Sequence, residues 1–383
     1  MKIVYVVPII APYAIPRYSA LAAKKDVEVH IVVERMTNNE RAGWAYTDVP
    51  GCTVHMLNSK MAHSYQITNK TNGYKMDKMR YFSFGLQNKI NEIQPDIVLV
   101  CNSTQILFLL GPRKYKLGVV VEDTLRAAEG RSRINKILKN MMLRLADFYI
   151  PFSDDAVEFL NMNRLRKPQL RSYWSMDRED FSTLSKMEIN KAKDAFGMDA
   201  IKNFVLVAGL IPRKGILQFL KAWNMMDGTF KENCKLFIIG DGPLKDEIQQ
   251  YIENNKLENV IMVGNKPYTE VIQYYQCADI FVLPTLEDLC SLSVLEAMAS
   301  GLPVLTTIYN GARQFVLEGV NGYIFDPLNE DSVCNALKNI HTADLEKMSE
   351  ASLKEVEKYA TQTVMDKLYY DLLEFLKSTR KSK

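Results

Sequence analysis

Runs of Val, Ile, Leu and Phe alternate twice along the chain with segments of helical spacing. In the first half, the runs with strand character are 2–7, 27–34, 54–57, 95–100, 117–122 and 148–152. Between them, residues 16–25, 85–93 and 134–146 and a segment from Asp154 have helical spacing. Strands that are buried on both faces appear as continuous apolar runs. The alternation therefore predicts a parallel sheet with helices on both faces.

A second series of the same kind begins near Asn203. Its predicted strands are 204–208, 235–239, 259–263, 279–283 and 303–306. Its predicted helices are 216–223, 243–254, 268–276 and 293–299, with a further helical block from Asp331 and a last helix near 361–378. The polar, charged stretch 164–195 resembles a linker. We expect an α/β protein of two Rossmann-like, doubly wound domains, 1–180 and 181–360. The terminal segment 361–383 forms a helix that could pack back on the N-terminal domain.

Open parallel sheets bind ligands beyond the carboxyl ends of their strands. Two such domains that face each other would enclose a cleft, which is a common place for a ligand. The chain has 383 residues, a length that fits two domains. We therefore look for functional residues in the loops that follow the predicted strands.

Several classes of protein are disfavoured. No apolar run reaches the ~18 residues of a membrane span, and the short run after Met1 lacks a cleavage site, which predicts a cytoplasmic protein. The six cysteines include no C-x-x-C pair and the four histidines no H-x-x-x-H pair, so we expect neither a disulfide framework nor a metal site. The loop 8–17 contains no glycine, which argues against a nicotinamide-binding first domain.

Charge is unevenly distributed between the two halves. Residues 1–180 carry 26 Lys and Arg and 18 Asp and Glu, a balance of +8, whereas residues 181–383 carry 22 and 27, a balance of −5. A basic half suggests an anionic partner, either a phosphate-bearing acceptor or an anionic membrane. Ordinary surface charge is the alternative. No nucleic acid partner is expected.

One basic segment of the first half has amphipathic spacing. Its cations are Arg126, Arg131, Arg133, Lys136, Lys139 and Arg144, and its apolar residues are Ile134, Ile137, Leu138, Met141 and Met142. A basic amphipathic helix can rest on anionic lipid. The alternative is a helix whose apolar side packs on the sheet and whose basic side is solvated.

Cationic residues also follow predicted strands. After 204–208 comes the loop 209–215, in which Arg213 and Lys214 are adjacent. Lysine supplies a point charge and arginine a planar fork of donors, a combination that suits a diphosphate. Arg17 lies near the start of the first predicted helix, where it could contact an anion, although a solvated arginine is the alternative.

The segment 279–327 is the most informative. A strand ends at Pro284, a loop carries Asp288, and a helix begins near 291–293. The unpaired N–H groups at a helix start favour an anion. Glu296, about one turn into the helix, would repel a phosphate but can accept hydrogen bonds from sugar hydroxyl groups. Asp288 could likewise accept hydrogen bonds from the hydroxyl groups of a second sugar. A solvent-exposed helical glutamate is the alternative for Glu296.

These motifs resemble the GT-B-fold retaining glycosyltransferases of family 4, the glycosyl transferases group 1. The family places seven residues between an acidic residue and a glutamate, which matches Asp288 and Glu296. The resemblance implies that Asp288 holds hydroxyl groups of the donor sugar and Glu296 those of the nucleotide ribose. The backbone of Ser291, Leu292 and Ser293 would contact the diphosphate, with Ser291 in place of the family's glycine.

The family's Lys-Gly pair matches Lys214 and Gly215, whereas its usual arginine falls on Gly209, so Arg213 is expected to substitute. By the same resemblance, the base would lie near 264–267, beside Asn265 and Lys266. In the first domain, many members have a histidine where this chain has Glu122 and Asp123, and either acid could take over its contact to the donor sugar.

The resemblance implies a retaining, metal-independent hexosyltransferase without a cofactor. It would transfer a sugar from a nucleotide diphosphate sugar to a saccharide or lipid-linked saccharide, in surface polysaccharide or glycolipid biosynthesis. A cytoplasmic location, with peripheral contact to the inner face of the membrane, is compatible with that role. A nucleotide-sugar epimerase on the same architecture and a non-catalytic sugar-binding protein are the alternatives. The assignment requires that Lys214 and Glu296 do not lie on opposite sides of their domain.

Overall fold

The structure is a computed structural model that describes residues 1–35, 47–57, 59–68, 75–129 and 131–381. The chain forms two units, Met1–Ser175 with Thr361–Lys383 and Met176–Ala360. Each unit contains a six-stranded sheet in which all the strand pairs are parallel. The first boundary therefore lies before Met176 instead of near residue 180, because the loop 176–180 belongs to the second unit.

The sheet of the first unit has the strand order β3-β2-β1-β6-β7-β8. Its strands are β1 (Lys2–Val7), β2 (Glu28–Val33), β3 (Cys52–Met56), β6 (Ile97–Val100), β7 (Lys116–Val121) and β8 (Phe148–Pro151). All four residues of β6 are buried, as expected for a central strand covered on both faces. The six expected strands are all present, with ends that differ by at most two residues.

The helices of the first unit follow its strands. They are α1 (Ile15–Ala22), α2 (Leu86–Ile93), the 3-10 segment η3 (Ser103–Phe108), α3 (Leu125–Glu129), α4 (Arg133–Arg144) and α5 (Asp154–Met162). An antiparallel hairpin of β4 (Lys60–Thr68) and β5 (Lys75–Phe82) was not predicted. It forms a separate two-stranded sheet, and its strands mix charged, polar and apolar residues without the continuous apolar runs of the parallel strands.

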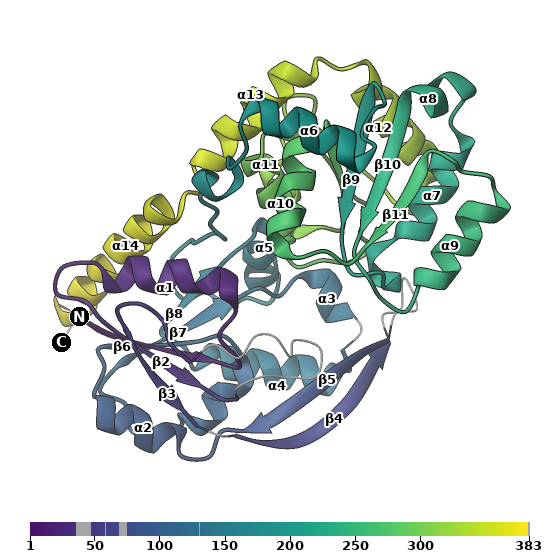
Figure 1. Cartoon of the computed structure of the whole chain (residues 1–383). Helices are drawn as coiled ribbons and strands as arrows, with labels where there is room; N and C mark the ends of the chain where they lie inside the picture. Colours follow the sequence, from purple (N-terminus) through teal and green to yellow (C-terminus); the bar gives the residue numbers. More distant parts are fainter. Residues whose placement is uncertain (36–46, 58, 69–74, 130, 382–383) are drawn as a thin grey trace. The chain divides into compact units, whose positions relative to one another are not determined.

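The last helix, α14 (Thr361–Lys381), belongs to the first unit, as the sequence allowed. It runs beside α1 (Figure 1), where Lys24 pairs with Asp366. Its Phe375 ring lies 4.6 Å from that of Phe148 on β8, measured between ring centroids. The residues 382–383 of the expected segment lie outside the described residues.

The sheet of the second unit has the order β11-β10-β9-β12-β13-β14. Its strands are β9 (Lys202–Val207), β10 (Cys234–Ile239), β11 (Val260–Gly264), β12 (Ile280–Leu283), β13 (Val304–Thr307) and β14 (Gly322–Phe325). The edge strand β14 was not predicted, because Gly322 and the four-residue length give it little strand signal. The core beneath this sheet is built around fully buried Trp223 and Phe204, whose rings meet edge to face at 5.2 Å.

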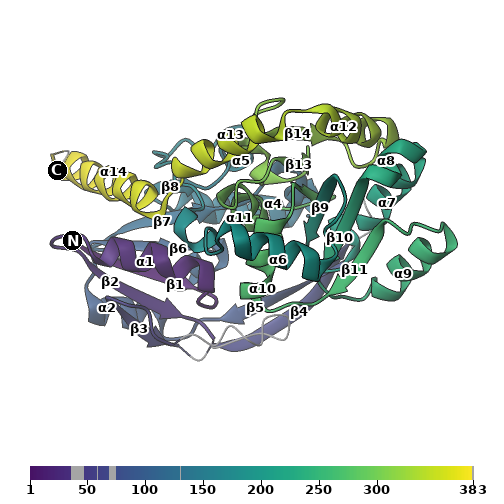
Figure 2. The same cartoon turned by 45° about the horizontal axis from the view of Figure 1, so that its top comes forward.

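The helices of this unit cover both faces of the sheet. They are α6 (Lys186–Phe196), α7 (Ile216–Met225), α8 (Gly228–Asn233), α9 (Lys245–Asn254), α10 (Tyr268–Cys277), α11 (Leu292–Ala299), α12 (Glu330–Thr342) and α13 (Leu345–Glu357). The expected linker over 164–195 is wrong in its second half, since α6 packs beside α10 (Figure 2). Ser185 and Glu188 form a capping box at its start, a signal present in the sequence. Three short 3-10 segments, η4 (Arg178–Phe181), η5 (Pro212–Lys214) and η6 (Gly311–Phe315), complete the unit.

The strand orders locate a switch point in each sheet. Chain order reverses between β1 and β6 in the first unit and between β9 and β12 in the second. Ligands of open parallel sheets bind beyond the carboxyl ends of the strands at such a point. In the second unit, the loops after β9 and β12 carry the residues that the sequence singled out. None of the described helices combines the length and the apolar character needed to cross a bilayer.

Candidate active site

The loop after β9 brings Lys214 to the end of β12. It forms η5 and closes on Gly215, which has a φ of +66°. A Cβ atom at Gly215 would lie 2.1 Å from the Pro284 carbonyl oxygen, so only glycine allows this approach without a shift of the backbone. The loop is held by the Leu286 N–H, which donates to the Arg213 carbonyl oxygen at 2.7 Å. Two loops that are distant in sequence thus meet at the switch point.

Asp288 is the centre of a polar cluster there. Its Oδ2 accepts hydrogen bonds from Lys214 Nζ at 2.6 Å, Arg213 Nη1 at 3.1 Å and Ser291 Oγ at 2.9 Å. Burial alone would raise the pKa of Asp288, but the charges of Lys214 and Arg213 hold it below its usual value. Within the described part of the chain, Oδ1 of Asp288 has no hydrogen-bond partner. One oxygen is therefore fixed while the other can accept a hydrogen bond from a ligand.

The start of α11 presents unpaired donors. Ser291 is its N-cap residue, and no side chain caps the helix. Among the described residues, the N–H groups of Leu292 and Ser293 have no acceptor, as is usual for the first turn of a helix. Lys214 Nζ also lies 3.4 Å from Ser291 Oγ. An ammonium group and two amide N–H groups are therefore available to an anion at one helix start.

Asn310 supports this helix start and was not singled out from the sequence. Its buried Oδ1 accepts hydrogen bonds from the N–H groups of Ser291 at 3.3 Å and Ala312 at 3.0 Å. The next residue, Gly311, packs so closely that a Cβ atom would lie 1.8 Å from the Leu289 carbonyl oxygen. The Asn-Gly pair was visible as a turn signal. Its contact with the loop after β12 depends on tertiary structure.

Glu296 lies in the second turn of α11 and is held by two tyrosines of α10. Tyr268 donates its hydroxyl hydrogen to Oε1 at 3.0 Å and Tyr275 donates to Oε2 at 3.1 Å. Burial raises the pKa of Glu296, although these two hydrogen bonds oppose part of the rise. Nothing in the sequence pointed to the two tyrosines, which precede Glu296 by 28 and 21 residues. Lys214 and Glu296 are thus both tied to α11, one at its N-cap and one in its second turn.

The other expected donor-binding residues, Asn265, Lys266 and Gly209, lie in the loops that follow β11 and β9. Lys266 forms an ion pair with Glu270 at 2.6 Å, and Asn265 is exposed beyond the edge strand β11. Gly209 follows β9, and a Cβ atom there would meet only the Asp241 carbonyl oxygen, at 3.9 Å. A side chain at position 209 would therefore have room, and the substitution of Arg213 for the family's arginine stays a prediction.

In the first unit, the structure separates the two acids that follow β7. Asp123 accepts from Arg131 Nη2 at 2.7 Å and also pairs with Lys139. Glu122 exerts its charge on Arg17, which follows β1, the strand at the switch point of this sheet. Asp123 is therefore paired with two cations, Arg131 and Lys139. Glu122 instead interacts with Arg17, near the switch point where a parallel sheet of this kind is expected to bind a ligand.

Arg17 is buried, in contrast to the alternative of a solvated arginine. Its guanidinium group donates to the Tyr173 carbonyl oxygen and to Ser172 Oγ, and it lies 4.8 Å from the centroid of the Phe152 ring. Burial lowers the pKa of Arg17, and the charge of Glu122 acts against that shift. These contacts join α1 to the segment that ends at Ser175, and a contact of Arg17 with an anion stays a prediction.

The described residues contain no group of three His, Cys, Asp or Glu side chains placed to hold a metal ion. The polar groups gathered at the switch point of the second unit are instead two cations, two helix N–H groups and two carboxylates.

The sequence of the second unit is similar to a family model and to several known proteins. Residues 188–359, nearly all of the second unit, match the family model of the glycosyl transferases group 1. The lipopolysaccharide 1,2-N-acetylglucosaminetransferase of Salmonella typhimurium is 32% identical over 173 residues, which are 42% of this chain and 43% of that protein. The alpha-monoglucosyldiacylglycerol synthase of Acholeplasma laidlawii is 28% identical over 202 residues, 50% of each. The chain thus spans half or less of these relatives.

Solved structures resemble the whole chain. The sucrose-phosphate synthase of Thermosynechococcus elongatus matches with a TM-score of 0.72 and 14% identity and covers 100% of both chains. HepE from Anabaena, solved in complex with UDP, matches with a TM-score of 0.71 and 16% identity over 99% of this chain and 100% of that one. At such low identity the likeness concerns the fold. The expected fold class, GT-B with two doubly wound parallel sheets, is confirmed.

The matched segment 188–359 contains Lys214, Asp288 and Glu296, whereas Arg17, Glu122 and Asp123 lie outside it. The family match therefore covers the candidate residues of the second unit and none of those of the first unit.

Proposed function

We propose that this chain is a glycosyltransferase that transfers a sugar from a nucleotide diphosphate sugar to a saccharide or lipid-linked saccharide. The observation that carries the proposal is the cluster of Lys214, Asp288 and the start of α11 at the switch point of the second unit. The family match over 188–359 supports it, as do the names of the relatives, which are transferases and synthases of glycosylated products.

In the proposed reaction, the bond between the sugar and the diphosphate breaks while the acceptor hydroxyl oxygen bonds to the sugar, and the hydroxyl proton passes to an oxygen of the departing diphosphate. Negative charge then grows on the departing diphosphate. Lys214 and Arg213 neutralise that charge, and the N–H groups of Leu292 and Ser293 donate to its oxygens. Donors fixed in advance at such a site stabilise the transition state without reorganisation.

The carboxylates orient the donor. Asp288 accepts a hydrogen bond from a sugar hydroxyl group through Oδ1, since Oδ2 is already held by three donors. Glu296 accepts from ribose hydroxyl groups, which would share or replace the hydrogen bonds of Tyr268 and Tyr275. Asn265 and Lys266 are proposed to lie beside the base.

In the first unit, we propose that Glu122 orients the donor sugar or the acceptor. We propose that Asp123, which pairs with Arg131 and Lys139, does not contact the donor. We further propose that the enzyme retains the anomeric configuration and needs no metal or cofactor, because protein cations take the role that a metal would otherwise fill. NMR analysis of the anomeric configuration of the first product, in reactions with and without a chelator, tests both statements.

The names of the relatives favour surface polysaccharide or glycolipid biosynthesis. We propose a cytoplasmic location with peripheral contact to the inner face of the membrane, because a lipid-linked acceptor would be presented there.

The decisive variant is Lys214→Ala. We expect it to bind nucleoside diphosphates more weakly and to lose activity by about 100-fold or more, the magnitude seen when a preorganised donor to developing charge is removed. Lys221→Ala, which removes an exposed lysine of α7, is the matched control and should behave as the parent chain. Calorimetric titration with UDP, GDP and ADP measures binding, and transfer from the corresponding donor sugars measures activity. Near-normal turnover of Lys214→Ala would contradict the proposal.

Incubation with donor alone separates the two alternatives from a transferase. An epimerase converts the donor sugar without an acceptor, whereas a binding protein leaves every donor unchanged with or without one. The proposed enzyme forms product only when an acceptor is present.

A further inference from the structure

The two faces of helix α4 have different surroundings. Its apolar residues at helical spacing are exposed, among them Ile134 at 70% and Met141 at 56%. The alternative that this apolar side packs on the sheet is therefore wrong, and the one fully buried residue of the helix is Leu143. The opposite face carries Lys136 and Asn140, which line a pocket. The pocket and the exposed apolar residues thus belong to separate surfaces.

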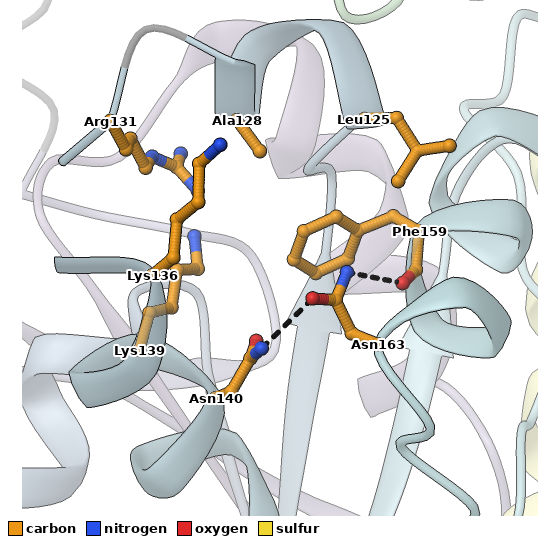
Figure 3. Close-up of a pocket in the computed structure, with 8 residues that line it drawn as sticks. All are labelled: Leu125, Ala128, Arg131, Lys136, Lys139, Asn140, Phe159 and Asn163. Atoms are coloured by element: carbon orange, nitrogen blue, oxygen red, sulfur yellow. Dashed lines mark hydrogen bonds between the residues drawn. The ribbon is translucent and has the colours of Figure 1, made fainter. Parts of the chain in front are cut away.

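The pocket has a volume of about 270 Å³ and is lined by residues of α3, α4, α5 and the turns beside them. Figure 3 shows Arg131, Lys136 and Lys139 along one side of it and Phe159 on the other. Leu125 extends the apolar wall. Sites for small molecules usually combine apolar walls with a few convergent polar groups, which is the composition found here.

Two asparagine side chains link the helices that form the pocket. Asn140 donates to Asn163 Oδ1 at 2.8 Å, and Asn163 in turn donates to the Phe159 carbonyl oxygen at 2.8 Å (Figure 3). These hydrogen bonds hold α4 against the end of α5 and fix the shape of the pocket. A recess whose walls are already in place loses less conformational freedom when a ligand binds.

Positive charge exceeds negative charge around this pocket. Asp123 accepts a hydrogen bond from Arg131 Nη2 at 2.7 Å and pairs with Lys139. Lys136 forms neither a hydrogen bond nor an ion pair with any residue that the structure describes. One carboxylate therefore faces three cations, and Arg131 has further N–H donors beyond the one that Asp123 accepts. The pocket is complementary to a small anion.

We propose that this pocket binds the phosphate group of a small soluble phosphate ester, such as a sugar phosphate. Lys136 donates to the phosphate oxygens as a point charge, Arg131 supplies a planar set of donors, and Lys139 adds positive charge. The apolar wall at Phe159 faces the organic part of the molecule. The site lies in the first unit and is separate from the proposed donor site of the second unit, so it does not depend on the proposed function.

Lysine labelling tests the proposal on the full chain. An acylating reagent modifies exposed lysines, and mass spectrometry gives the rate at each position. At constant ionic strength, inorganic phosphate and glucose 6-phosphate should slow the labelling of Lys136, with half the effect at a concentration on the order of 1 mM. Glucose should have no effect, and Lys221, an exposed lysine of α7, should be labelled at an unchanged rate.

Two variants change the charge of the pocket in opposite directions. Lys136→Gln should weaken phosphate binding about tenfold or more, because a hydrogen bond to a charged group is lost. Asp123→Asn removes the carboxylate that competes with phosphate for Arg131 and Lys139, so binding should strengthen roughly threefold or more. Arg144→Gln, which removes an exposed cation of α4 outside the pocket, is the control and should bind phosphate as the parent chain does.

Scanning calorimetry measures these effects, because phosphate should raise the unfolding transition of the unit that binds it. The proposal is overturned if phosphate does not protect Lys136 in the parent chain. It is also overturned if Lys136→Gln and Arg144→Gln reduce the phosphate-dependent shift equally, since binding would then reflect general positive charge. Weaker phosphate binding by folded Asp123→Asn would contradict the competition described above.

Vesicles distinguish the two sources of a phosphate group. If phosphatidylglycerol vesicles protect Lys136 and neither soluble phosphate does, the ligand is a lipid and the assignment to a soluble ester is wrong. Nucleoside diphosphate binding is measured separately on each variant. Loss of phosphate binding with intact nucleotide binding therefore leaves the proposed function untouched.

Discussion

At the scale of single residues, the donor site is defined by two carboxylates in contrasting surroundings. Asp288 is held by cations, which keep its pKa low and its charge fixed. Glu296 is held by two neutral hydroxyl groups, and burial raises its pKa. The first carboxylate is therefore ionised over the whole neutral range, whereas the second costs free energy when it ionises in the native state.

This contrast predicts opposite effects of Glu296→Gln on stability and binding. A raised native pKa means that the folded state holds the proton more tightly, so stability falls as pH rises through the window above the ordinary glutamate value. The neutral variant avoids that cost, and its melting temperature at pH 7 should equal or exceed that of the parent chain. Its affinity for a nucleoside diphosphate should fall about tenfold, since a hydrogen bond to a charged acceptor is lost.

Calorimetric titration between pH 5 and pH 8 checks the binding, with Glu258→Gln, an exposed position, as control. The parent chain should lose affinity relative to Glu296→Gln as pH falls through the raised pKa. Equal affinity of Glu296→Gln and the parent chain at pH 7 would show that Glu296 does not contact the ligand.

At the scale of elements, the site depends on loops that approach each other at the ends of strands. The loop after β9 reaches β12 because Gly215 leaves space for the Pro284 carbonyl oxygen. The loop after β13 reaches the start of α11 through Asn310. The helix and strands supply a rigid frame, and the glycine-dependent contacts set where Lys214 lies.

We therefore expect Gly215→Ala to disturb both stability and binding. The added methyl group would collide with backbone, and alanine disfavours a φ of +66°, so stability should fall by at least ~1–3 kcal/mol. Gly228→Ala is the matched control, since its Cβ atom would meet nothing within 4 Å and helix α8 favours alanine over glycine. Thermal unfolding and nucleotide titration of both variants measure the effect. Equal behaviour of the two would contradict the role given to Gly215.

At the scale of the whole molecule, the chain leaves the first unit after Ser175 and returns to it at Thr361. The first unit is therefore completed by a helix that is distant in sequence from its sheet. Phe375 packs its ring against Phe148 of β8, and Lys24 pairs with Asp366. The stability of the first unit thus depends on residues that follow the entire second unit.

Phe375→Ala should lower the stability of the first unit by about 3 kcal/mol, as is typical when a buried phenylalanine is truncated. Tyr370→Ala, on the same helix but at a position 65% exposed, should have little effect. Scanning calorimetry with and without a nucleoside diphosphate identifies the transitions, because the nucleotide should raise only that of the second unit. A shift of the nucleotide-sensitive transition in Phe375→Ala would contradict this assignment.

The sequence by itself determined the two parallel sheets, because strands buried on both faces must be continuously apolar whatever their neighbours. It also singled out Lys214, Asp288 and Glu296, since short motifs fix which groups follow a strand or begin a helix. It did not reveal the hairpin β4–β5, whose strands mix polar and apolar residues, or the edge strand β14, which has only four residues and begins with glycine.

Only the tertiary structure decided which side chains these groups meet. The tyrosines that hold Glu296 and the side chain of Asn310 lie on elements that are distant from their partners in sequence. Glu122 and Asp123 are adjacent in sequence but have different surroundings, and no periodic pattern in the sequence distinguishes them. The apolar residues of α4 have amphipathic spacing, and this spacing would be the same whether they faced the sheet or solvent. Periodicity fixes which residues share a face of a helix, but the packing of the whole unit fixes what that face contacts.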